Sequence, residues 1–489
     1  MVFSNLIFIY IFLPLNLAFY FLAKDIKTKN AILLIFSLFF YAWGEPIYVL
    51  LLIGMALADW FFAKVIEKHR GTGMAKAAMI GAAVVSIGLI GVFKYGTFVC
   101  ENLNSAFGFP SEIPNIALPI GISFYTFQLL SYVVDVYRGD VEAQEKFSRV
   151  LLYASLFHQC IAGPIVRYKD VSEEIACRST NVVEMGKGIN RFTVGLAKKV
   201  LLANVCGSLC DSFLISDATA GDMSLFAENM KVLSSRPALA LWLGMLSYML
   251  QIYLDFSAYS DMAIGMGQMI GFHYKENFDY PYMSKTVGEF WRRWHMSLGT
   301  FFRDYVYIPL GGNRKGKGRM FLNMFVVWSL TGLWHGASWN FVLWGLYFFV
   351  FLFLERLFLG KLLEKLPAFF SRAYLLIVVF FGWIIFKFRS LDMCFAVIKG
   401  MFCLNSNNFS GYEDVAMLKN NIFFFIVAII ACTPLVKKLG EVISKNADNE
   451  IKFANIQGVI QIVTPIILLL VSTLGLIGDS YNPFLYFQF

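Results

Sequence analysis

The sequence has little charge for its length. Only 15% of its 489 residues are Asp, Glu, Lys or Arg, whereas about a quarter of the residues are charged in a typical soluble domain. Hydrophobic residues make up 58% of the chain, and long apolar runs recur from one end to the other. A soluble globular protein is therefore excluded, and we expect one continuous membrane domain over residues 1–489.

Closely spaced cysteines are also lacking. The eight cysteines are scattered, no CxxC motif occurs, and only Cys206 and Cys210 lie close together. Disulfide frameworks and cysteine-based metal sites need closer or more regular spacing than this. We therefore expect no metal site and no permanently bound cofactor.

The N-terminus lacks the basic residues that precede the apolar core of a secretory signal peptide. Its first charged residue is Lys24, and Lys27 and Lys29 follow. Basic residues after an apolar run indicate a transmembrane helix that starts outside the cell and ends in the cytoplasm. We assign the net charge of +8 to such cytoplasmic loops, and no basic region suggests nucleic acid binding.

Apolar runs of roughly 17–25 residues, long enough to cross a bilayer, occur about twelve times. Their centres lie near residues 12, 37, 55, 85, 125, 203, 247, 327, 348, 381, 429 and 467. The predicted fold is therefore an all-α bundle of about twelve membrane spans. The positive-inside rule predicts that both termini and the loop 215–236 lie outside. The basic loops expected in the cytoplasm are 24–29, 64–70, 314–319 and 437–445.

Two apolar stretches, roughly 150–166 and 291–310, do not fit a simple alternation of spans. If both crossed the membrane, the charged segments 167–191 and 311–319 would be hard to place together with the other basic loops. We expect both stretches to re-enter the membrane or to lie along its cytoplasmic face. Broken backbone at that depth has to be shielded by protein or face water, so a central tunnel or cavity is expected beside it.

Charged side chains nevertheless occur inside the apolar body. A charge at the bilayer centre costs about 2.5–3.5 kcal/mol on insertion scales. The simplest interpretation is therefore that these groups pair with one another and hold tilted helices together. The arginines concerned are Arg292, Arg293 and Arg303, and their expected acidic partners are Glu289, Asp304, Asp255 and Asp261.

One histidine, His335, lies in a run without any other ionisable side chain, LTGLWHGASWNFVLWG (330–345). The small residues Gly336, Ala337 and Ser338 predict a turn between two spans. One interpretation is a buried imidazole in a helix contact, and the other is an imidazole that lines a cavity. An imidazole, with a free pKa of ~6.5, stays neutral when it is buried without an anion. A neutral imidazole can take the proton of an attacking hydroxyl.

His295, in WRRWH within the second broken stretch, is the second candidate. Its imidazole could orient His335 or bind an acyl donor. The other three histidines have less support, because His69 lies in a basic loop, His273 lies near a loop, and His158 only begins a polar break.

Several ordered motifs resemble the membrane-bound O-acyltransferase (MBOAT) superfamily, and in particular its bacterial alginate O-acetyltransferase branch. The resemblance covers nearly the whole chain. A lone WHG triplet would be weak evidence, but a match of many ordered motifs by chance is very improbable. The motifs are, in order, MVFSN, YAWGEP, LPIGISFYTFQLLSYVVDVYRG, AGPIVRY, DFSAYSDMAIG, EFWRRWHMSLGTFFRDYVYIPLGGNR, LTGLWHGASWNFVLWG and NPFLYFQF.

The resemblance implies a helix bundle around a tunnel, with the invariant histidine of the superfamily at His335 and a second site residue at His295. It implies an enzyme that takes an acyl group, here expected to be acetyl, from a cytoplasmic donor such as acetyl-CoA. The acceptor would be an extracellular or periplasmic polysaccharide, often reached through a periplasmic SGNH-type acyltransferase with a serine nucleophile. One position departs from the family pattern, which often has His-Gly where this chain has Phe348-Phe349.

Further site residues are expected from the chemistry. Donor phosphates need cations at the cytoplasmic mouth of the site, and a tetrahedral oxyanion needs hydrogen-bond donors. The expected donor-binding residues are Arg292, Arg293, Arg303 and Arg314. The candidate oxyanion donors are Trp339, Asn340, Ser338 and His295.

Two other functions stay open at the level of sequence. Within the superfamily, the alternative is D-alanyl transfer to a cell-wall polymer from a carrier-protein thioester. Outside it, a transporter or flippase would also have intramembrane charges and broken helices. Such a transporter would have no special need for His335.

Overall fold

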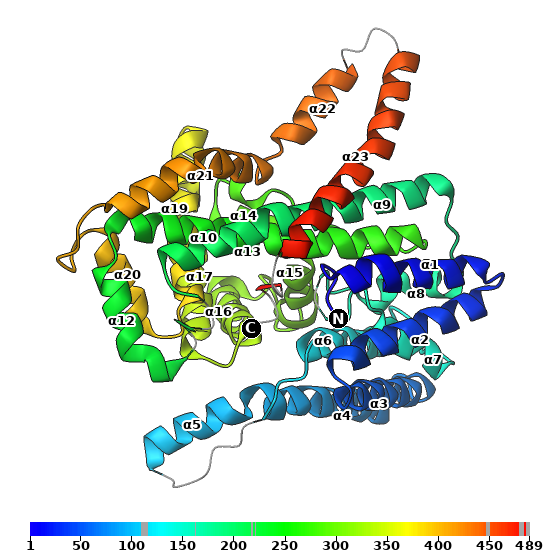
Figure 1. Cartoon of the computed structure of the whole chain (residues 1–489). Helices are drawn as coiled ribbons and strands as arrows, with labels where there is room; N and C mark the ends of the chain where they lie inside the picture. The colour runs from blue at the N-terminus through cyan, green and yellow to red at the C-terminus, as the bar shows by residue number, and fades with distance from the viewer. Residues whose placement is uncertain are drawn as a thin grey trace.

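The computed structural model describes residues 1–108, 116–161, 163–216, 219–220, 222–445, 450–478 and 484–485. Every regular element in these ranges is a helix. Figure 1 shows many of the long helices running side by side in roughly one direction, as in a helix bundle that spans a membrane. The all-α prediction is confirmed for the described part of the chain.

Nine of the described helices, or unbroken runs of helices, are long and apolar enough to cross a membrane. Each contains one of the twelve expected centres, and the chain is a multi-pass membrane protein. Six are single helices: α2 (Ile26–Gly44), α3 (Tyr48–Lys68), α13 (Ala238–Met269), α19 (Ala368–Lys387), α21 (Tyr412–Ala431) and the part Gly458–Gly478 of α23 (Glu450–Gly478). In the other three a π-helical turn joins two helices: α4 (Gly73–Ile90) with α5 (Gly96–Phe107), α9 (Val182–Ala197) with α10 (Asn204–Phe213), and α17 (Trp339–Leu354) with α18 (Gly360–Lys365).

The other three expected centres also lie in helices, but these are shorter or less apolar. Residue 12 lies in the apolar helix Phe8–Leu22, whose second part is α1 (Leu13–Leu22). Residue 125 lies in α6 (Ile122–Arg138) and residue 327 in α16 (Gly316–His335). Most side chains of α6 are buried, including polar ones. Neighbouring helices shelter α6, so it carries polar groups that a lipid-facing helix would not.

Several short helices and turns lie at the two ends of the bundle. Figure 1 places α5, α12 (Phe226–Ser235) and α20 (Leu391–Met401) together at one end. The turn between α1 and α2 and the short helix α8 (Tyr168–Ala176) lie at the other end. The basic loop 24–29 is thus opposite the segment around α12, as the positive-inside rule predicts.

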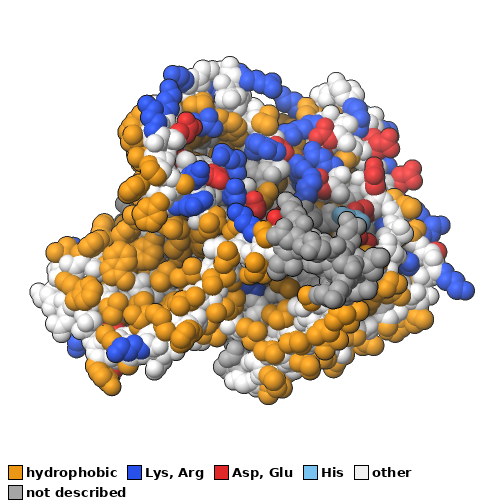
Figure 2. All heavy atoms as spheres, turned by 90° about the horizontal axis from the view of Figure 1, so that it is seen from above, with side chains coloured by type: hydrophobic (Ala, Val, Ile, Leu, Met, Phe, Trp, Pro, Cys, Tyr) orange, Lys and Arg blue, Asp and Glu red, His pale blue; other side chains and the backbone are white. Residues whose placement is uncertain are grey.

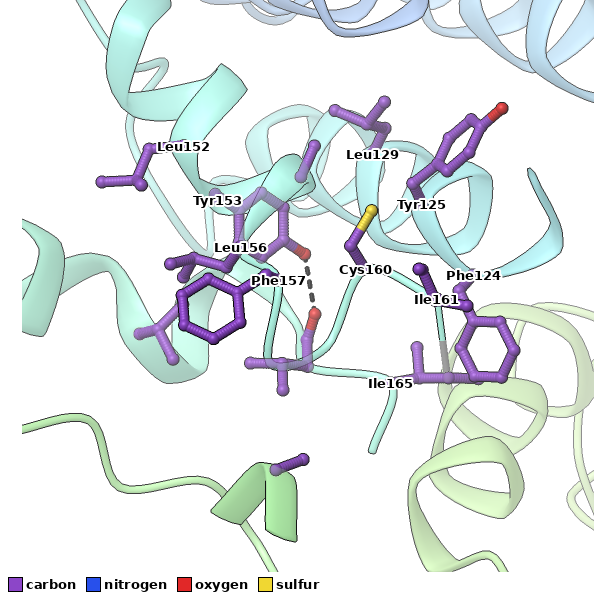
Figure 3. Packing of buried hydrophobic residues seen from close by; sticks show 14 of the residues in the cluster. Phe124, Tyr125, Leu129, Leu152, Tyr153, Leu156, Phe157, Cys160, Ile161 and Ile165 are labelled. Atoms are coloured by element: carbon purple, nitrogen blue, oxygen red, sulfur yellow. Dashed lines mark hydrogen bonds between the residues drawn. The ribbon is translucent and has the colours of Figure 1, made fainter. Parts of the chain in front are cut away.

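Neither of the two stretches that were expected to re-enter the membrane or to lie along its cytoplasmic face forms a single crossing helix. The first contains α7 (Phe147–Ser155), followed by irregular and mostly buried backbone at 156–161 and 163–167. Figure 3 shows how its apolar side chains pack, with the Tyr153 hydroxyl donating to the carbonyl of Val166 (2.8 Å). The second contains α14 (Val287–Arg293), α15 (Met296–Phe302) and the π-helical turn η6 (Arg303–Tyr307). All of these helices are too short to cross a bilayer alone.

The buried side chains form two hydrophobic clusters. One cluster is built mainly from α1 to α9 and includes Trp334 of α16. The other is built mainly from α10, α13, α17 and α19 and includes Trp294 and Trp344. The long helix α13 contributes to both clusters. The residues around His335 come from both clusters, so the candidate site lies where the clusters meet.

The molecular surface suits a membrane environment. Large apolar side chains are exposed on many helices, for example Ile35, Leu50, Phe61 and Ile377. Figure 2 shows broad apolar areas on one face, with the charged side chains gathered over part of it. Apolar areas of this extent are unusual on soluble monomers and are covered by lipid tails in a membrane protein.

Candidate active site

His335 is the last residue of α16, directly before the turn into α17. The two helices cross so closely that a Cβ atom on Gly345 would collide with the carbonyl oxygen of Trp328. Gly336 continues in extended backbone, and Ser338 is the N-cap residue of α17. The turn predicted between two apolar helices is therefore present, and it leaves the imidazole at the tip of α16.

The His335 side chain is 7% exposed and lines a cavity of about 20 Å³, which has room for one water-sized group. Aromatic rings surround the imidazole, with centroid distances of 5.0 Å to Trp334, 4.9 Å to Trp344 and 5.2 Å to Phe386. The geometry favours the cavity interpretation over a sealed helix contact. The other residues that line the cavity are Ile252, Asp255, Phe256, Trp294, Trp383 and Leu485.

His295 lies in the break between α14 and α15, with a left-handed backbone (φ 46°) that is uncommon for residues other than glycine. Its Nδ1 is 3.2 Å from Oδ1 of Asn277. The same Oδ1 accepts the backbone N–H (3.1 Å) and the hydroxyl (2.9 Å) of Ser297, which identifies it as the amide oxygen. In the neutral imidazole, Nδ1 therefore carries the proton. Nε2 keeps its lone pair and has no hydrogen-bond partner among the described residues.

Trp334 connects the two histidines. Its ring centroid lies 5.0 Å from that of His335 and 5.7 Å from that of His295. The structure thus brings together the two histidines that the sequence singles out. His158 is buried elsewhere, and His273 is exposed.

The acidic residues of the long helix α13 pair with cations other than the predicted arginines. The carboxylate of Asp255, which is 2% exposed, lies 2.6 Å from Nζ of Lys199. The carboxylate of Asp261 lies 2.6 Å from Nζ of Lys198 and 3.0 Å from the guanidinium of Arg191. These cations belong to α9 and to the turn after it, which pack along α13. Pairing of Asp255 and Asp261 with Arg292, Arg293 or Arg303 is therefore wrong.

The other part of that prediction is confirmed for Arg293 and Arg303, whereas no ion pair is found for Arg292 among the described residues. Arg293 lies 3.0 Å from Glu289, one helical turn before it, and Arg303 lies 2.7 Å from Asp304. Both pairs are local and partly exposed, so they contribute little to stability.

Two further cavities meet at Met296, the residue after His295. Their volumes are about 920 Å³ and 110 Å³, and both also have Glu276 in their walls. The larger cavity is lined by the cations Arg191, Lys198 and Lys437, and the smaller by Arg167 and Lys275. The four expected donor-binding arginines line neither cavity: Arg293 and Arg303 are in the pairs described above, and Arg292 and Arg314 are exposed.

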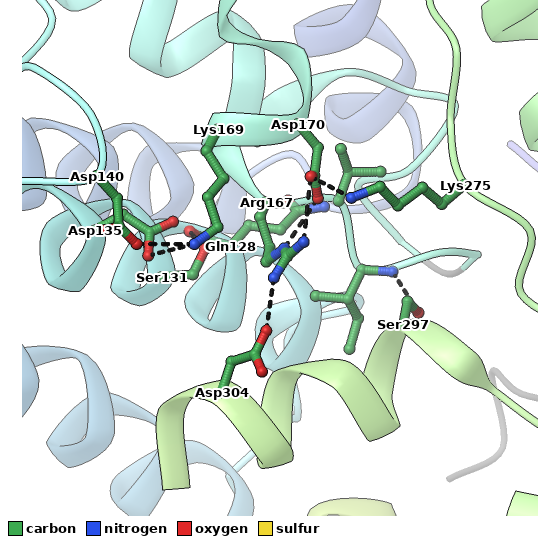
Figure 4. A network of polar contacts seen from close by, with 12 residues as sticks. Gln128, Ser131, Asp135, Asp140, Arg167, Lys169, Asp170, Lys275, Ser297 and Asp304 are labelled. Atoms are coloured by element: carbon green, nitrogen blue, oxygen red, sulfur yellow. Dashed lines mark hydrogen bonds and ion pairs between the residues drawn. The ribbon is translucent and has the colours of Figure 1, made fainter. Parts of the chain in front are cut away.

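A polar network borders the smaller cavity (Figure 4). The Arg167 guanidinium joins Asp304 (2.8 Å) to Asp170 of α8 (2.9 Å), and Asp170 also accepts a hydrogen bond from Lys275. Burial by itself raises the pKa of Asp170, but the hydrogen bonds from Arg167 and Lys275 outweigh it and hold the pKa below its usual value of 3.8. Asp170 is therefore an ionised part of the network at neutral pH.

Most of the expected oxyanion donors are bound elsewhere. Trp339 is 58% exposed, and its indole Nε1 donates to Oδ1 of Asn102 on α5 (2.9 Å). Nδ2 of Asn340 donates to the carbonyl oxygen of Ile385 on α19 (3.2 Å). Ser338 is half-buried in the turn before α17 and does not line the cavity. These side chains fix the start of α17 to its neighbours.

Lys94 was missed by sequence reasoning. It lies in the π-helical turn η2 (Gly91–Tyr95) between α4 and α5, and its Nζ donates to the carbonyl oxygen of Trp334 (2.5 Å). The Tyr95 hydroxyl donates to the carbonyl oxygen of Leu333 (2.5 Å). Carbonyl groups in the last turn of a helix lack partners within the helix. A lone lysine in a long apolar run is the signal that could have found this residue.

Comparison with known proteins agrees with this geometry. The profile of MBOAT, the membrane-bound O-acyltransferase family, matches residues 143–398. The "Probable alginate O-acetylase AlgI" of Pseudomonas putida is 35% identical over the whole of both chains. The "Peptidoglycan O-acetyltransferase" of Helicobacter pylori is 29% identical over 100% of this chain and 98% of its own. The "Teichoic acid D-alanyltransferase" of Bacillus subtilis is 27% identical over 56% of this chain and 68% of its own.

The chain belongs to the membrane-bound O-acyltransferase family and is an acyltransferase. The transporter alternative is set aside on this ground.

Proposed function

We propose that this enzyme moves an acyl group, most simply acetyl, from a cytoplasmic thioester to a hydroxyl on the outer side of the membrane. The proposal rests on the position of the two histidines, which both contact Trp334. His335 lines the small aromatic cavity, and His295 directly precedes Met296 in the wall of the large charged cavity. The relatives named for alginate and for peptidoglycan act on polysaccharides, which supports an extracellular or periplasmic glycan as the acceptor.

The break between α14 and α15 separates the two cavities. Phe278 and Met296 line the large cavity, whereas Phe256 and Trp294 line the small one. His295 lies between these pairs, with ring centroids 4.7 Å from Phe256 and 6.5 Å from Phe278. The thioester arm of a donor would pass this partition, and its charged end would stay in the large cavity.

The large cavity suits the polar end of such a donor. Lys437 lies in α22 (Leu435–Lys445), in the segment 437–445 that the positive-inside rule predicts to be cytoplasmic. Arg191 and Lys198, both paired with Asp261, also line this cavity and would have to exchange that partner for a donor phosphate. Phosphate groups form strong, charge-assisted hydrogen bonds with such cations. The proposed donor, acetyl-CoA or another acyl thioester, therefore binds here and not at the four arginines expected from the sequence.

His335 acts as the general base of the transfer. Its neutral imidazole takes the proton of the acceptor hydroxyl as that oxygen attacks the thioester carbonyl carbon. The carbon–sulfur bond then breaks, and the leaving thiolate takes the proton back from the imidazolium. His295 offers the lone pair of Nε2 at the partition, where it can accept a hydrogen bond and orient the reacting groups.

The proposed setting is the bacterial cytoplasmic membrane, with both termini outside. The acceptor hydroxyl then approaches His335 from the outer side. It belongs either to the glycan itself or to the serine of a periplasmic SGNH-type acyltransferase that passes the acyl group on.

The test compares wild type, His335→Gln and His158→Gln in cells that lack the native protein. His158 is also buried, at 1% exposure, but it lies away from the cavity, so it is a matched control. Mass spectrometry of cell-surface glycans should show acylation with wild type and with His158→Gln. We expect a loss of about 100-fold or more with His335→Gln. An inserted His335→Gln protein that acylates at the wild-type rate would falsify the proposal.

D-alanyl transfer from a carrier protein is the second candidate. It is supported by the similarity to a teichoic acid D-alanyltransferase and by the acidic residues of the large cavity, Asp261, Glu276 and Asp279, which offset its cations. A carrier arm with a single phosphate needs fewer cations than coenzyme A does. Purified protein supplied with acetyl-CoA or with a D-alanyl carrier thioester should release thiol from only one of them.

A further inference from the structure

The indole of Trp344 is a buried hydrogen-bond donor in the wall of the His335 cavity. Trp344 lies on α17, is 0% exposed, and has its ring centroid 4.9 Å from that of His335. Its Nε1 has no hydrogen-bond partner among the described residues. A buried N–H group without an acceptor destabilises the folded state. Such a group in a native protein therefore needs an explanation, for example an acceptor that is present only when a ligand binds.

Asp255 and His295, two other polar groups at or beside the cavity, are poorly suited to donate a hydrogen bond to a bound atom. The carboxylate of Asp255 is held by Lys199. Nε2 of His295 carries no proton in the neutral tautomer, so it accepts hydrogen bonds and cannot donate one. Nε1 of Trp383 also has no hydrogen-bond partner among the described residues, but the Trp383 ring contacts Trp294 and Trp344, whereas the Trp344 ring contacts His335 itself. The N–H of Trp344 is therefore the donor best placed to meet a bound atom.

The Trp344 ring is held firmly by its neighbours. Its centroid lies 5.3 Å from Phe348, 5.2 Å from Phe386 and 5.4 Å from Trp291. A hydrogen-bond donor fixed in this way does not have to reorient when negative charge develops beside it. The aromatic surroundings exclude water, which strengthens the hydrogen bond.

We propose that the indole N–H of Trp344 stabilises the oxyanion of the acyl transfer, a role that rests on the proposed function. When the acceptor oxygen bonds to the carbonyl carbon, the carbonyl π electrons move to its oxygen, which then accepts the N–H hydrogen bond. When the carbon–sulfur bond breaks, these electrons return and the carbonyl re-forms. A cavity of about 20 Å³ accommodates one such oxygen beside His335.

The test is Trp344→Phe, which removes the N–H but keeps an aromatic ring. The matched control is Trp242→Phe, because Trp242 is a half-buried tryptophan of α13 whose N–H is also removed by this change, but it does not line the cavity. Acyl transfer is measured in membranes with the donor thioester that wild type uses. For Trp344→Phe we expect kcat to fall on the order of 100-fold, with KM within about twofold of wild type. Trp242→Phe should stay near wild type in kcat and KM.

If Trp344→Phe has the wild-type kcat, Trp344 does not stabilise the oxyanion. The same conclusion follows if kcat falls equally in Trp344→Phe and in the control variant. If Trp344→Phe unfolds in detergent, benzothienylalanine at position 344 replaces it, because sulfur takes the place of the N–H in a ring of nearly the same shape. Wild type and His335→Gln are run in parallel. An inactive wild type, or an active His335→Gln, contradicts the proposed function itself and not the role of Trp344 alone.

Discussion

At the scale of single residues, one amide group sets the state of His295. Oδ1 of Asn277 accepts hydrogen bonds from Nδ1 of His295 and from the backbone N–H and hydroxyl of Ser297. Asn277→Ala frees the imidazole to rotate and to take the other tautomer. We expect kcat to fall about tenfold, because small misplacements of reacting groups are costly. Steady-state acyl transfer by the inserted variant checks this.

Asn277→Asp separates orientation from charge. A carboxylate can accept the same hydrogen bonds, but it also favours the protonated imidazole. We expect Asn277→Asp to hold His295 in place and yet to lose rate at low pH, where Nε2 becomes protonated. If Asn277→Ala and Asn277→Asp both transfer the acyl group at the wild-type rate at every pH, His295 and Asn277 have only a structural role.

The two histidines could be predicted from the sequence, but most of their surroundings could not. His335 and His295 stand out because each is an ionisable group in a locally apolar or broken stretch. Trp344 resembles any core tryptophan in the sequence, and only the structure shows that its N–H lies at the cavity without a partner in the described part of the chain. Lys199 and Lys94 contact the site from helices that are distant in sequence, and local spacing carries no information about such pairs.

At the scale of elements, the crossing of α16 and α17 depends on glycine. A Cβ atom at Gly345 would collide with the carbonyl oxygen of Trp328, and backbone atoms cannot move aside as a flexible side chain can. We expect Gly345→Ala to destabilise the protein by about 1–3 kcal/mol. Thermal unfolding in detergent measures this. Gly318→Ala is the control on α16, because nothing lies within 4 Å of its Cβ position, and its unfolding temperature should not fall.

The end of α16 also depends on the helix run from α4 to α5. Lys94 donates a hydrogen bond to the carbonyl oxygen of Trp334, one residue before His335, and so satisfies a carbonyl group that the last turn of α16 leaves without a helical partner. We expect Lys94→Met to lower kcat about tenfold, which corresponds to about 1.4 kcal/mol of lost interaction. Lys94→Arg should keep most of the activity. Lys76→Met, at the exposed start of α4, is the control, and an equal loss in that variant would contradict a local role for Lys94.

Helix positions followed from the apolar pattern, because lipid demands long apolar runs and nine of the expected centres meet that demand. The helices α6 and α16 are not among these nine. Helix α6 has only 17 residues and includes buried polar side chains, and α16 begins with the polar residues of a basic loop. The breaks at 150–166 and 291–310 were predictable from charge placement. The short helices inside them depend on tertiary packing.

At the scale of the whole molecule, the two hydrophobic clusters meet along α13, and the cavities lie on the two sides of the break before α15. A tunnel was expected from the broken stretches. The volumes and the lining residues follow from how the helices pack, which no single stretch of sequence determines. In the proposed function, a donor that passes from the large cavity towards His335 would have to pass the small group of side chains around His295.

The network of Figure 4 ties α8 to η6 and to the segment after α13, so it should make the stability of the whole molecule depend on pH. The folded-state pKa of Asp170 lies below the usual 3.8. The unfolded chain therefore takes up this proton first as the pH falls. The stabilisation is complete well above pH 4 and is lost as the pH falls through the folded-state pKa.

Asp170→Asn should accordingly lower the unfolding temperature at pH 7 by about 2 °C. The difference in unfolding temperature between Asp170→Asn and wild type should become smaller below about pH 4, because the Asp170 carboxylate of wild type then becomes protonated and loses its charge. Asp392→Asn is the control, because Asp392 is exposed and no ion pair is found for it among the described residues. If the difference in unfolding temperature stays constant from pH 7 to pH 3, Asp170 stabilises the protein through its shape and hydrogen bonds and not through its charge.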